Sequence, residues 1–464
     1  MLEKARIAGS IIALLGAVSG EAMKESEING LKFSIISENE AVIVRTVRKE
    51  ENVFIPSNVF DLRNGKSYCV VLVASNGFKS LPIKKIVIPR TVQILESSCF
   101  EGCKSLTSIS FETNSQLRCI KSSAFVDSSL KFIAIPPHVE ILESRCFSGC
   151  RSLVGISFEL GSRLQCIESR VFYGSSLQSV TIPRRVEVLG SECFNGCQSL
   201  ESVSFEADSR LKCIELLAFG GTNLKRSIIP KSVETLGGRC FGWCQSLKSI
   251  SFEPDSQLRD IKSRAFSATS LKYIEIPPRV KVLGSACSEK FCPKEITVPH
   301  YVEVLGLGCF SECWSLESVS FEIDSQLKRI EIEAFCKTSL KSITIPRRVE
   351  ILGSACFCEC PSLASVSFEP DSQLRCIELA VFWGSPLQSI TIPRHVEIIG
   401  SGCFGVCLSL ESIFFETDSG QEKRMTISGS EQREIQLPQD TRPFLMKCCP
   451  RTEDVSVTMV ENPR

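Results

Sequence analysis

The sequence predicts a solenoid of about 15 stacked coils, each of 22–24 residues, with a parallel β-sheet along one face. Three observations support this fold class. A proline that follows isoleucine or valine recurs every 47 residues, with one shorter interval of 22 between Pro277 and Pro299. Each 47-residue unit divides into two coils that open on the apolar pattern L-x-x-I-x-I. Apolar and polar side chains alternate in that pattern, as in a β-strand with one buried face. The prolines of the repeat are Pro89, Pro136, Pro183, Pro230, Pro277, Pro299, Pro346 and Pro393.

The two coils of a unit differ in how their strand segment ends. One type, the IP coil, opens for example at Leu340 and ends its strand in Ile-Pro. The other type, the FE coil, opens for example at Leu363 and ends its strand in Phe-Glu. A coil of this length holds one short strand, followed by short turns or 3-10 or helical segments on the opposite face. It cannot bury its apolar side chains alone, so the coils must stack on one another.

Each coil carries one phenylalanine at a fixed place after its strand, and we expect these rings to point into the core. In the IP coils they are Phe100, Phe147, Phe194, Phe241, Phe310, Phe357 and Phe404. A glycine column is expected at tight corners with positive φ. It comprises Gly190, Gly237, Gly284, Gly306, Gly353 and Gly400. Asp-Ser pairs in the FE coils are expected to form Asx-type turns.

The N-terminal part of the chain departs from the regular repeat. Residues 1–20 combine two basic residues with a short apolar run, which predicts a signal peptide or, alternatively, an N-terminal helix. Residues 31–82 read as a degenerate capping repeat, with strands expected at 31–36 and 41–47. Terminal repeats are atypical because they cover the exposed end of the core.

Regular coils are expected over residues 83–420, with one shortened unit at 277–299 where an FE coil is missing. Residues 421–464 are polar and predict a C-terminal cap or a disordered tail. No apolar segment near the C-terminus is long enough to anchor the chain in a membrane, and the apolar run at the N-terminus is too short to span one as a helix. We therefore expect no transmembrane anchor.

The charge balance argues against two classes of partner. The chain has 53 Lys and Arg and 53 Asp and Glu, so its net charge is zero, which gives no electrostatic basis for binding nucleic acid or an anionic membrane. The balance is also local. IP coils carry basic residues after the strand, such as Arg347-Arg348, and FE coils carry acids there, such as Glu369. We expect alternating rows of solvated charges that neutralise one another.

Cysteine is abundant, with 25 in the chain, and most occur as C-F-x-x-C in the IP coils. A zinc site needs a second convergent pair of Cys or His, and none is near in the sequence. The first cysteine occupies the column that alanine fills in FE coils, so it is expected to act as a small buried apolar residue. Equivalent cysteines in successive IP coils lie two coils apart, about 10 Å, which is too far for a disulfide. We favour buried free thiols over local disulfides, and no metal is expected.

These motifs are similar to those of the BspA-like subclass of leucine-rich repeats. The match runs through residues 177–183, which read LQSVTIP, then Val186, Leu189-Gly190, Cys193-Phe194 and Cys197. The strand pair and I-P-S step at residues 31–59 also resemble the first repeat of that family. The resemblance implies a leucine-rich-repeat solenoid. Its members are often described as surface proteins or adhesins of bacteria and protozoan parasites that bind host proteins.

Residues with catalytic potential do not converge in the sequence. The three histidines, His138, His300 and His395, lie many coils apart, in a polar row after the I-P or V-P step. The glycines occur about one per coil, so no phosphate-binding glycine loop is present. We therefore expect no enzyme activity, no metal and no cofactor.

The exposed positions of the strands are the predicted recognition surface, as is usual in solenoids. Phe132 and Tyr273 replace serine there, and exposed aromatic residues are enriched at binding sites. At the shortened unit two IP coils are expected to stack directly, which brings cationic rows together without an acidic row between them. The candidate protein-binding residues are Phe132, Lys272, Tyr273, Glu275, Lys294 and Glu295.

Two functions agree with these observations. The first is a non-enzymatic protein-interaction module of a surface or secreted, adhesin-like or antigen-like protein. It is extracellular if residues 1–20 act as a signal peptide. The alternative is a cytoplasmic leucine-rich-repeat scaffold. Both bind protein partners.

Overall fold

The computed structural model divides into two compact units, Met1–Leu211 and Lys212–Arg464, and each is described by itself. The structure describes residues 25–28, 30–46, 51–61, 64–271, 276–283, 294–416 and 422–426. The proposed signal peptide at residues 1–20 lies outside the described residues, as do residues 427–464. The domain boundaries expected from the sequence therefore remain predictions.

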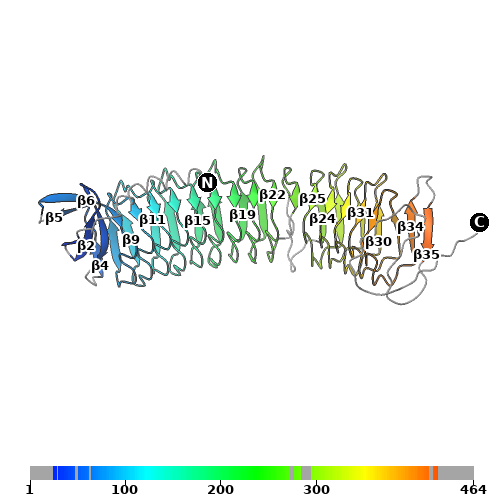
Figure 1. The fold of residues 1–464 in the computed structure, drawn as a ribbon, viewed down its shortest axis with the longest axis horizontal. Helices are drawn as coiled ribbons and strands as arrows, with labels where there is room; N and C mark the ends of the chain where they lie inside the picture. Colours follow the sequence, from blue (N-terminus) through cyan, green and yellow to red (C-terminus); the bar gives the residue numbers. More distant parts are fainter. Residues whose placement is uncertain are drawn as a thin grey trace, which may run out of the picture. The chain divides into compact units, whose positions relative to one another are not determined.

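The first unit contains two series of strands that alternate along the chain (Figure 1). The strands of its N-terminal part are β1 (Glu25–Ile28), β2 (Leu31–Ile35), β3 (Glu40–Thr46), β4 (Asn52–Phe54), β5 (Asn58–Asp61) and β6 (Lys66–Val73). Its four-residue strands are β7 (Lys85–Ile88), β9 (Ser108–Phe111), β11 (Phe132–Ile135), β13 (Gly155–Phe158), β15 (Ser179–Ile182) and β17 (Ser202–Phe205). Its two-residue strands are β8 (Ile94–Leu95), β10 (Cys119–Ile120), β12 (Ile141–Leu142), β14 (Cys166–Ile167) and β16 (Val188–Leu189).

The second unit continues the same alternation. Its two-residue strands are β18 (Cys213–Ile214), β20 (Thr235–Leu236), β22 (Asp260–Ile261), β23 (Val282–Leu283), β25 (Val304–Leu305), β27 (Arg329–Ile330), β29 (Ile351–Leu352), β31 (Cys376–Ile377) and β33 (Ile398–Ile399). The longer strands are β19 (Arg226–Ile229), β21 (Ser249–Phe252), β24 (Glu295–Val298), β26 (Ser318–Phe321), β28 (Ser342–Ile345), β30 (Ser365–Phe368), β32 (Ser389–Ile392), β34 (Ser412–Glu416) and β35 (Glu422–Thr426).

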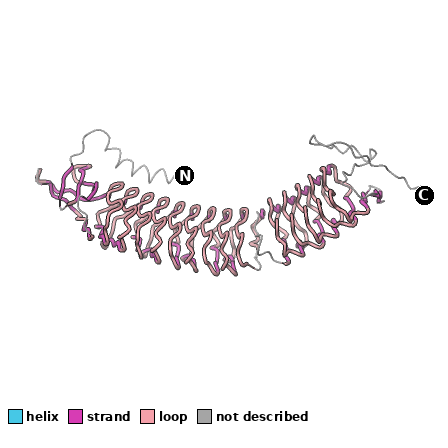
Figure 2. Tube along the Cα trace, turned by 90° about the horizontal axis from the view of Figure 1, so that it is seen from below, coloured by secondary structure: helices cyan, strands magenta, loops and turns pink. Residues whose placement is uncertain are grey.

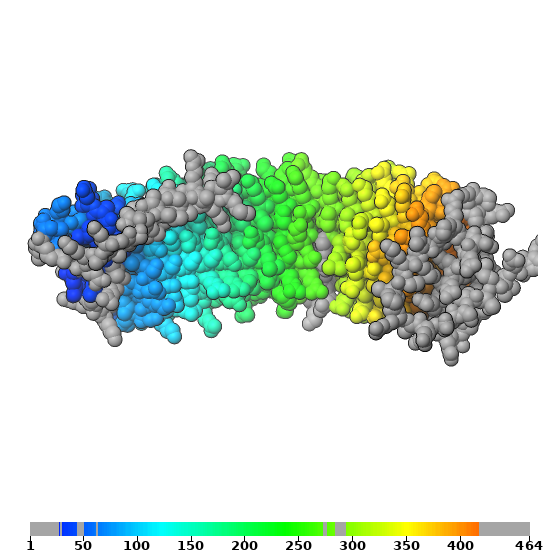
Figure 3. All heavy atoms as spheres, in the orientation of Figure 1, coloured from blue at the N-terminus to red at the C-terminus, as the bar shows by residue number. Residues whose placement is uncertain are grey.

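Each unit is a parallel β-solenoid, as the repeat predicts. In the first unit, β4, β7, β9, β11, β13, β15 and β17 form one seven-stranded sheet. The pairs are in register, so that Ile133 of β11 lies opposite Ile156 of β13. The two-residue strands pair in the same way, for example Ile120 with Leu142. In the space-filling view the colours change band by band along each unit, so each coil borders the coils next to it in sequence (Figure 3).

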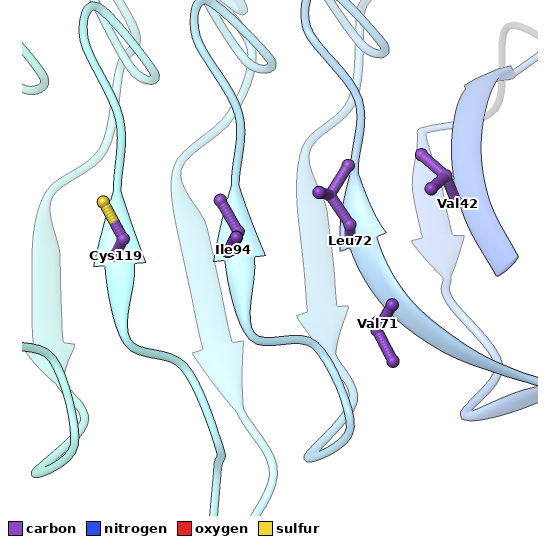
Figure 4. Close-up of a cluster of buried hydrophobic side chains, with 5 residues drawn as sticks. All are labelled: Val42, Val71, Leu72, Ile94 and Cys119. Carbon is purple, nitrogen blue, oxygen red and sulfur yellow. The ribbon is translucent and has the colours of Figure 1, made fainter. Parts of the chain in front are cut away.

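The N-terminal part of the first unit pairs differently. β2 and β3 are antiparallel, as expected for the two strands predicted at 31–36 and 41–47. β6 pairs in parallel with β8 and so continues into the regular coils, with Leu72 opposite Ile94. Figure 4 shows Leu72, Ile94 and Cys119 at equivalent places in successive coils, beside Val42 and Val71. The degenerate repeat thus shares its core with the first regular coils.

The broken repeat in the second unit brings two IP coils together. β23 pairs with β25, so that Val282 lies opposite Val304 and Leu283 opposite Leu305. The sequence predicts this direct stacking, because no FE coil follows Pro277. Fourteen of the roughly 15 expected coils have a described long strand, six of them (β7–β17) in the first unit and eight (β19–β34) in the second. The remaining strand would include residues 272–275, which lie outside the described residues.

The side opposite the sheet consists of turns. In the described ranges there is no α-helix and no 3-10 helix, and Figure 2 shows strands joined by loops. Of the alternatives that the sequence left open, short turns are therefore correct for these residues. Many turn residues have positive φ, among them Arg145 and Glu192. Amide groups of these turns bond to the next coil: Arg145 N donates to Ser169 O at 2.9 Å, and Phe147 N donates to Val171 O at 2.9 Å.

A ladder of phenylalanine rings fills the core of each unit. In the first unit, the rings of Phe100 and Phe125 lie 5.2 Å apart and nearly parallel, as do those of Phe125 and Phe147. In the second unit, Phe241 stacks between Phe219 and Phe266. The prediction that the IP-coil phenylalanines point inward is confirmed, since all seven are buried.

The expectation of positive φ for the glycine column is wrong for four of its members. Gly190, Gly237, Gly353 and Gly400 are absent from the positive-φ glycines. A Cβ on Gly190 would lie 2.6 Å from the carbonyl carbon of Glu168, and one on Gly353 would lie 2.7 Å from that of Glu331. Glycine is required because the preceding coil passes too close for any side chain.

The Asp-Ser turns also differ from expectation. Asp255 takes up a left-handed backbone conformation, with φ of 61°. The hydroxyl of Ser256 accepts the amide of Leu258 at 3.3 Å, and Ser325 and Ser372 act in the same way. The serine, rather than the aspartate carboxylate, makes the side-chain bond of this turn.

Truncation of one ring tests the phenylalanine ladder. We predict that Phe241→Ala lowers the free energy of unfolding by about 3–5 kcal/mol, because it leaves a cavity between two stacked rings. The matched control is Ile323→Ala at an exposed position of the same unit, which should change stability by about 0.5 kcal/mol or less. Urea denaturation measures both. Equal stability of the two variants would contradict the prediction that the stacked ring of Phe241 stabilises the fold.

Candidate functional site

The candidate site is the exposed face of the four-residue strands, which we name the strand face. The first and third side chains of these strands point to solvent and the second points to the core, while the fourth is buried in the Ile-Pro strands and half-buried in the Phe-Glu strands. In β11, Ile133 and Ile135 are buried, whereas Phe132 and Ala134 are exposed. Because neighbouring strands pair in register, the exposed positions line up in two columns across the sheet. The strand face is therefore a regular surface of mostly small side chains.

Phe132 is exposed on the strand face, as the sequence predicts, with 65% of its surface accessible. Its ring lies over Gly155 of the neighbouring strand, because a Cβ on Gly155 would fall 2.8 Å from the ring. The glycine thus makes room for the ring to rest on β13. Covering a strand glycine in this way protects its backbone, and the remaining surface of the ring is open to solvent.

Sequence reasoning missed two other exposed apolar residues of this face. Phe54 in β4 is 67% exposed, and its column neighbour is Val87. The signal was available, since Phe54 lies between the alternating core residues Val53 and Ile55. In the second unit Ile228 is exposed because β19 reads Arg-Ser-Ile-Ile, with serine at the buried second position and isoleucine at the exposed third position. There Ser227 occupies the buried position, and its hydroxyl lacks a hydrogen-bond partner among the described residues.

Hydroxyl groups pair across the strand face in both units. Thr181 and Ser204 lie 2.8 Å apart in the first unit. In the second unit, Thr344 and Ser367 lie 2.9 Å apart, and Thr297 pairs with Ser320 in the same way. These bonds hold the side chains upright in ordered rows. Rows of small hydroxyls leave the face shallow, so that a partner can approach the sheet closely.

Of the six predicted binding residues, the structure describes two more in addition to Phe132, namely Lys294 and Glu295 of the second unit. Lys294 is exposed, and its ammonium lies 3.7 Å from a carboxylate oxygen of Glu317. Glu295 is exposed at the start of β24, opposite Ser318. The other three residues, Lys272, Tyr273 and Glu275, lie outside the described residues. Binding at this junction stays a prediction.

The acidic row has a structural role that the sequence did not suggest. Six glutamates that follow the strands of the FE coils accept a hydrogen bond from the backbone N–H that follows the I-P or V-P proline of the preceding coil. For example, Arg347 N donates to Glu369 Oε2 at 2.9 Å. Other glutamates in the same role are Glu112, Glu206, Glu253, Glu322 and Glu416. The row therefore caps the strand ends and is not only a row of solvated charges.

Opposite charges also pair between coils, as expected. Arg347 lies 3.1 Å from Asp324, and Lys341 lies 2.7 Å from Glu317. The Lys341 ammonium is the largest cause that lowers the pKa of Glu317. These pairs are exposed, so each contributes little to stability. The surface beside the strands therefore carries positive and negative charges in alternation, which largely neutralise one another.

The second cysteine is a hydrogen-bond donor in six of the seven C-F-x-x-C segments. Its thiol donates to the carbonyl oxygen of the phenylalanine one coil earlier, as Cys150 does to Phe125 at 3.0 Å. The equivalent donors are Cys103, Cys197, Cys244, Cys360 and Cys407. In the FE coils serine or threonine fills this column, and Ser128 contacts Cys150 at 3.3 Å. Cysteine thiols and serine or threonine hydroxyls therefore alternate from coil to coil in this column, and they donate hydrogen bonds to backbone carbonyls that would otherwise be unpaired.

Burial suppresses the reactivity of these thiols. It raises the pKa of these six donor cysteines to about 11. It also raises the pKa of first cysteines such as Cys99 and Cys146, and the neighbouring thiols raise it further. Twenty described cysteines are free, and the preference for buried free thiols is confirmed for the 14 of them that are buried. Cys313 is the exception, because it is disulfide-bonded.

The described residues hold no group of three or more His, Cys, Asp or Glu side chains that could bind a metal ion. His300 and His395 are exposed, and His300 Nδ1 lies 3.0 Å from Glu322 Oε2. In the described ranges no helix is long and apolar enough to cross a membrane. These two histidines are thus surface residues of a polar row, as the sequence indicates, whereas His138 is partly buried and its Nδ1 lacks a hydrogen-bond partner among the described residues.

Thiol labelling tests the buried cysteines. We predict that a thiol-reactive dye at pH 8 labels few C-F-x-x-C cysteines of the folded chain, because a thiol reacts as its thiolate. Denaturation without reductant should expose most of them to labelling. Mass spectrometry of labelled peptides counts the sites. Fast labelling of Cys150 or Cys197 in the folded chain would disprove their burial, and a denatured chain without new thiols would establish disulfides.

The pKa of Glu322 offers a second test. It is lowered mainly by the backbone N–H of His300 and secondly by the imidazole. Because the folded-state pKa is depressed, this carboxylate stabilises the fold above its unfolded pKa, and the stabilisation is lost as pH falls through the folded pKa. We predict that His300→Ala raises the pKa of Glu322 towards, but not to, its ordinary value, since the backbone bond remains. Carboxylate NMR titration measures the shift, and His395→Ala should leave it unchanged.

Comparison with known proteins identifies the repeat. The sequence matches the family described as BspA type leucine-rich repeat region, in six copies, over overlapping segments. These segments are 72–201, 165–292, 212–331, 285–411 and 328–446, which together run from residue 72 to residue 446. No curated protein matches this chain.

Solved structures share the fold. A leucine-rich repeat protein from Bacteroides ovatus is 24% identical, with a TM-score of 0.57, and the match covers 84% of this chain and all of that one. A leucine-rich cell surface protein from Faecalibacterium prausnitzii is 21% identical, with a TM-score of 0.42, over 86% of this chain and 97% of that one. The pneumococcal vaccine antigen PcpA is 19% identical, with a TM-score of 0.46, over 78% and 88%. The first of these supports the solenoid fold alone.

Proposed function

Since this chain belongs to the family of BspA-type leucine-rich repeats, we propose that it is a non-enzymatic protein-interaction module whose strand face binds a protein partner. The family and its fold are typically binding modules, and they fit a protein-interaction role. We further propose that the chain works as a secreted or cell-surface binding protein of the adhesin or antigen type. That part rests on the short apolar run in residues 1–20 and on the family resemblance.

The observation that carries the binding role is the composition of the strand face. It presents ordered rows of serine and threonine with a few exposed rings, of which Phe132 and Phe54 are the largest in the first unit. Exposed aromatic residues surrounded by small polar ones are typical of binding hot spots. The opposite charges beside the strands pair with one another, so recognition would depend on shape and on the rings more than on net charge.

One observation favours the alternative of an intracellular scaffold. The described part of the chain holds 20 free cysteines. Proteins of oxidising compartments usually carry disulfides, whereas thiols persist in the reducing cytosol. The strand face would serve the same binding role there, so the two functions differ in compartment and partner rather than in the surface used.

Site-specific photo-cross-linking tests the strand face. A photoreactive residue at Ser179 in β15 probes the strand face, and one at the exposed Tyr173, six residues earlier, probes the turn side of the same unit. We predict that partner proteins cross-link through position 179 and not through position 173. Phe132→Ser should lower the yield at position 179 about tenfold or more, in line with loss of an aromatic hot spot. Leu160→Ser, at an exposed apolar position outside the strands, is the control.

Equal cross-linking from both positions would contradict recognition by the strand face. The compartment needs a separate measurement, namely the intact mass of the protein from its native source. Loss of about 20 N-terminal residues would support secretion. A full-length chain whose described thiols are free would support the scaffold.

A further inference from the structure

Two cysteines of the second unit lie one above the other in neighbouring coils. Cys336 follows Phe335 in an FE coil, and Cys358 follows Phe357 in the next IP coil. The two rings stack at 5.3 Å and are tilted by only 3°. The cysteines therefore occupy the same place in consecutive coils. The coils on either side have Ser311 and Trp383 there.

Backbone hydrogen bonds fix this register on both sides of the pair. Phe335 N donates to Cys356 O at 2.7 Å, and Lys337 N donates to Cys358 O at 2.8 Å. Paired backbones of this kind are about 4.8 Å apart. That spacing lies within the Cα separations of about 4.4–6.8 Å that a disulfide spans.

Both thiols are free, and each is among the groups that shift the pKa of the other. Cys358 is partly exposed, whereas Cys336 is 8% exposed beneath it. A small oxidant can therefore reach Cys358 first, with Cys336 within reach behind it.

We propose that Cys336 and Cys358 are a modification site, at which a small-molecule disulfide converts the two thiols into a reversible disulfide between adjacent coils. The reaction has two steps. The Cys358 thiolate attacks one sulfur of the oxidant RSSR, which forms a mixed disulfide and releases RS⁻. The Cys336 thiolate then attacks the Cys358 sulfur and releases the second RS⁻. Both cysteine protons end on the released thiols, so the chain loses two hydrogens and the oxidant becomes two RSH.

The surrounding groups decide how fast this happens. Burial raises the pKa of Cys336 to about 12, and the neighbouring Cys358 and Glu333 raise it further. Burial and Glu359 also raise the pKa of Cys358, and the neighbouring Cys336 and the charge of Lys337 partly offset this rise. Cys358 is thus the better attacking thiol on both exposure and ionisation.

Geometry also predicts that the bond is labile. Side chains at equivalent positions of stacked coils point the same way, so their Cβ atoms stay about 4.8 Å apart. A relaxed disulfide prefers a Cβ separation of about 3.8 Å. Closing the bond must draw the coils together locally, and strained disulfides are the ones most easily reduced.

The other free cysteines at regular positions of the repeat lack this arrangement, and Cys313 is already disulfide-bonded. Those at the start of the two-residue strands alternate with other residues, as Cys119 and Cys166 do on either side of Ile141. They are therefore two coils apart. Cys360, close to Cys336 in space, points into the core and donates to Phe335 O at 3.1 Å.

Peptide mapping of the oxidised full-length chain tests the proposal. The folded protein is treated with bis(2-hydroxyethyl) disulfide, alkylated and digested with trypsin without reductant. Cys336 is the sole cysteine of the tryptic peptide 330–337, and Cys358 lies in peptide 349–375 with Cys356 and Cys360. We expect these two peptides to be linked, with loss of two hydrogens, and the link to disappear on treatment with dithiothreitol.

Serine variants assign the bond, since serine occurs naturally at equivalent positions of other coils. Cys358→Ser should abolish the linked peptide. Cys336→Ser should leave the 2-hydroxyethyl thiol attached to Cys358. Cys360→Ser, which copies the Ser385 column of the FE coils, is the matched control and should keep the link. The proposal fails if the wild-type chain yields no link, if the link survives in Cys358→Ser, or if it is lost in Cys360→Ser.

Discussion

Every feature of this chain depends on the contact between one coil and the next. A coil of 22–24 residues has too few apolar side chains to form a core of its own. Its phenylalanine is buried because a ring of the neighbouring coil covers each face, as around Phe241. The backbone shows the same dependence, since amides such as that of Phe147 bond to the next coil. Each coil is therefore stabilised mainly by its contacts with the adjacent coils of its unit.

The same contact explains residue choices that otherwise look functional. Cysteine recurs because a small thiol fits the core and donates to a carbonyl, as Cys150 does to Phe125. Glutamate recurs because its carboxylate caps a backbone N–H of the preceding coil, as Glu369 does for Arg347. Both residue types are common in metal and catalytic sites. Here both residue types recur because they form hydrogen bonds between stacked coils. Candidate functional residues are therefore better sought at positions that differ from the repeat.

Departures from the repeat are accordingly the informative positions. Phe132 replaces a small polar residue on the strand face, and Gly155 makes room for its ring. Cys336 and Cys358 place two thiols in adjacent coils where other coils alternate. The first departure supports recognition of a partner, and the second supports a chemical response to oxidants. The two lie in different units and rest on different contacts, so either can hold without the other.

The sequence by itself determined the coil length, the parallel strands, the buried phenylalanines and the missing FE coil, because each leaves a periodic trace along the chain. It also identified Phe132 as exposed, from strict alternation in β11. Only the tertiary structure decided what one coil does to the next. It showed that Gly190 is required by the backbone of Glu168 rather than by its own φ. It also placed Cys336 and Cys358 at the same position of adjacent coils. Such contacts join residues about 22 positions apart, and their distance depends on stacking geometry that no local pattern records.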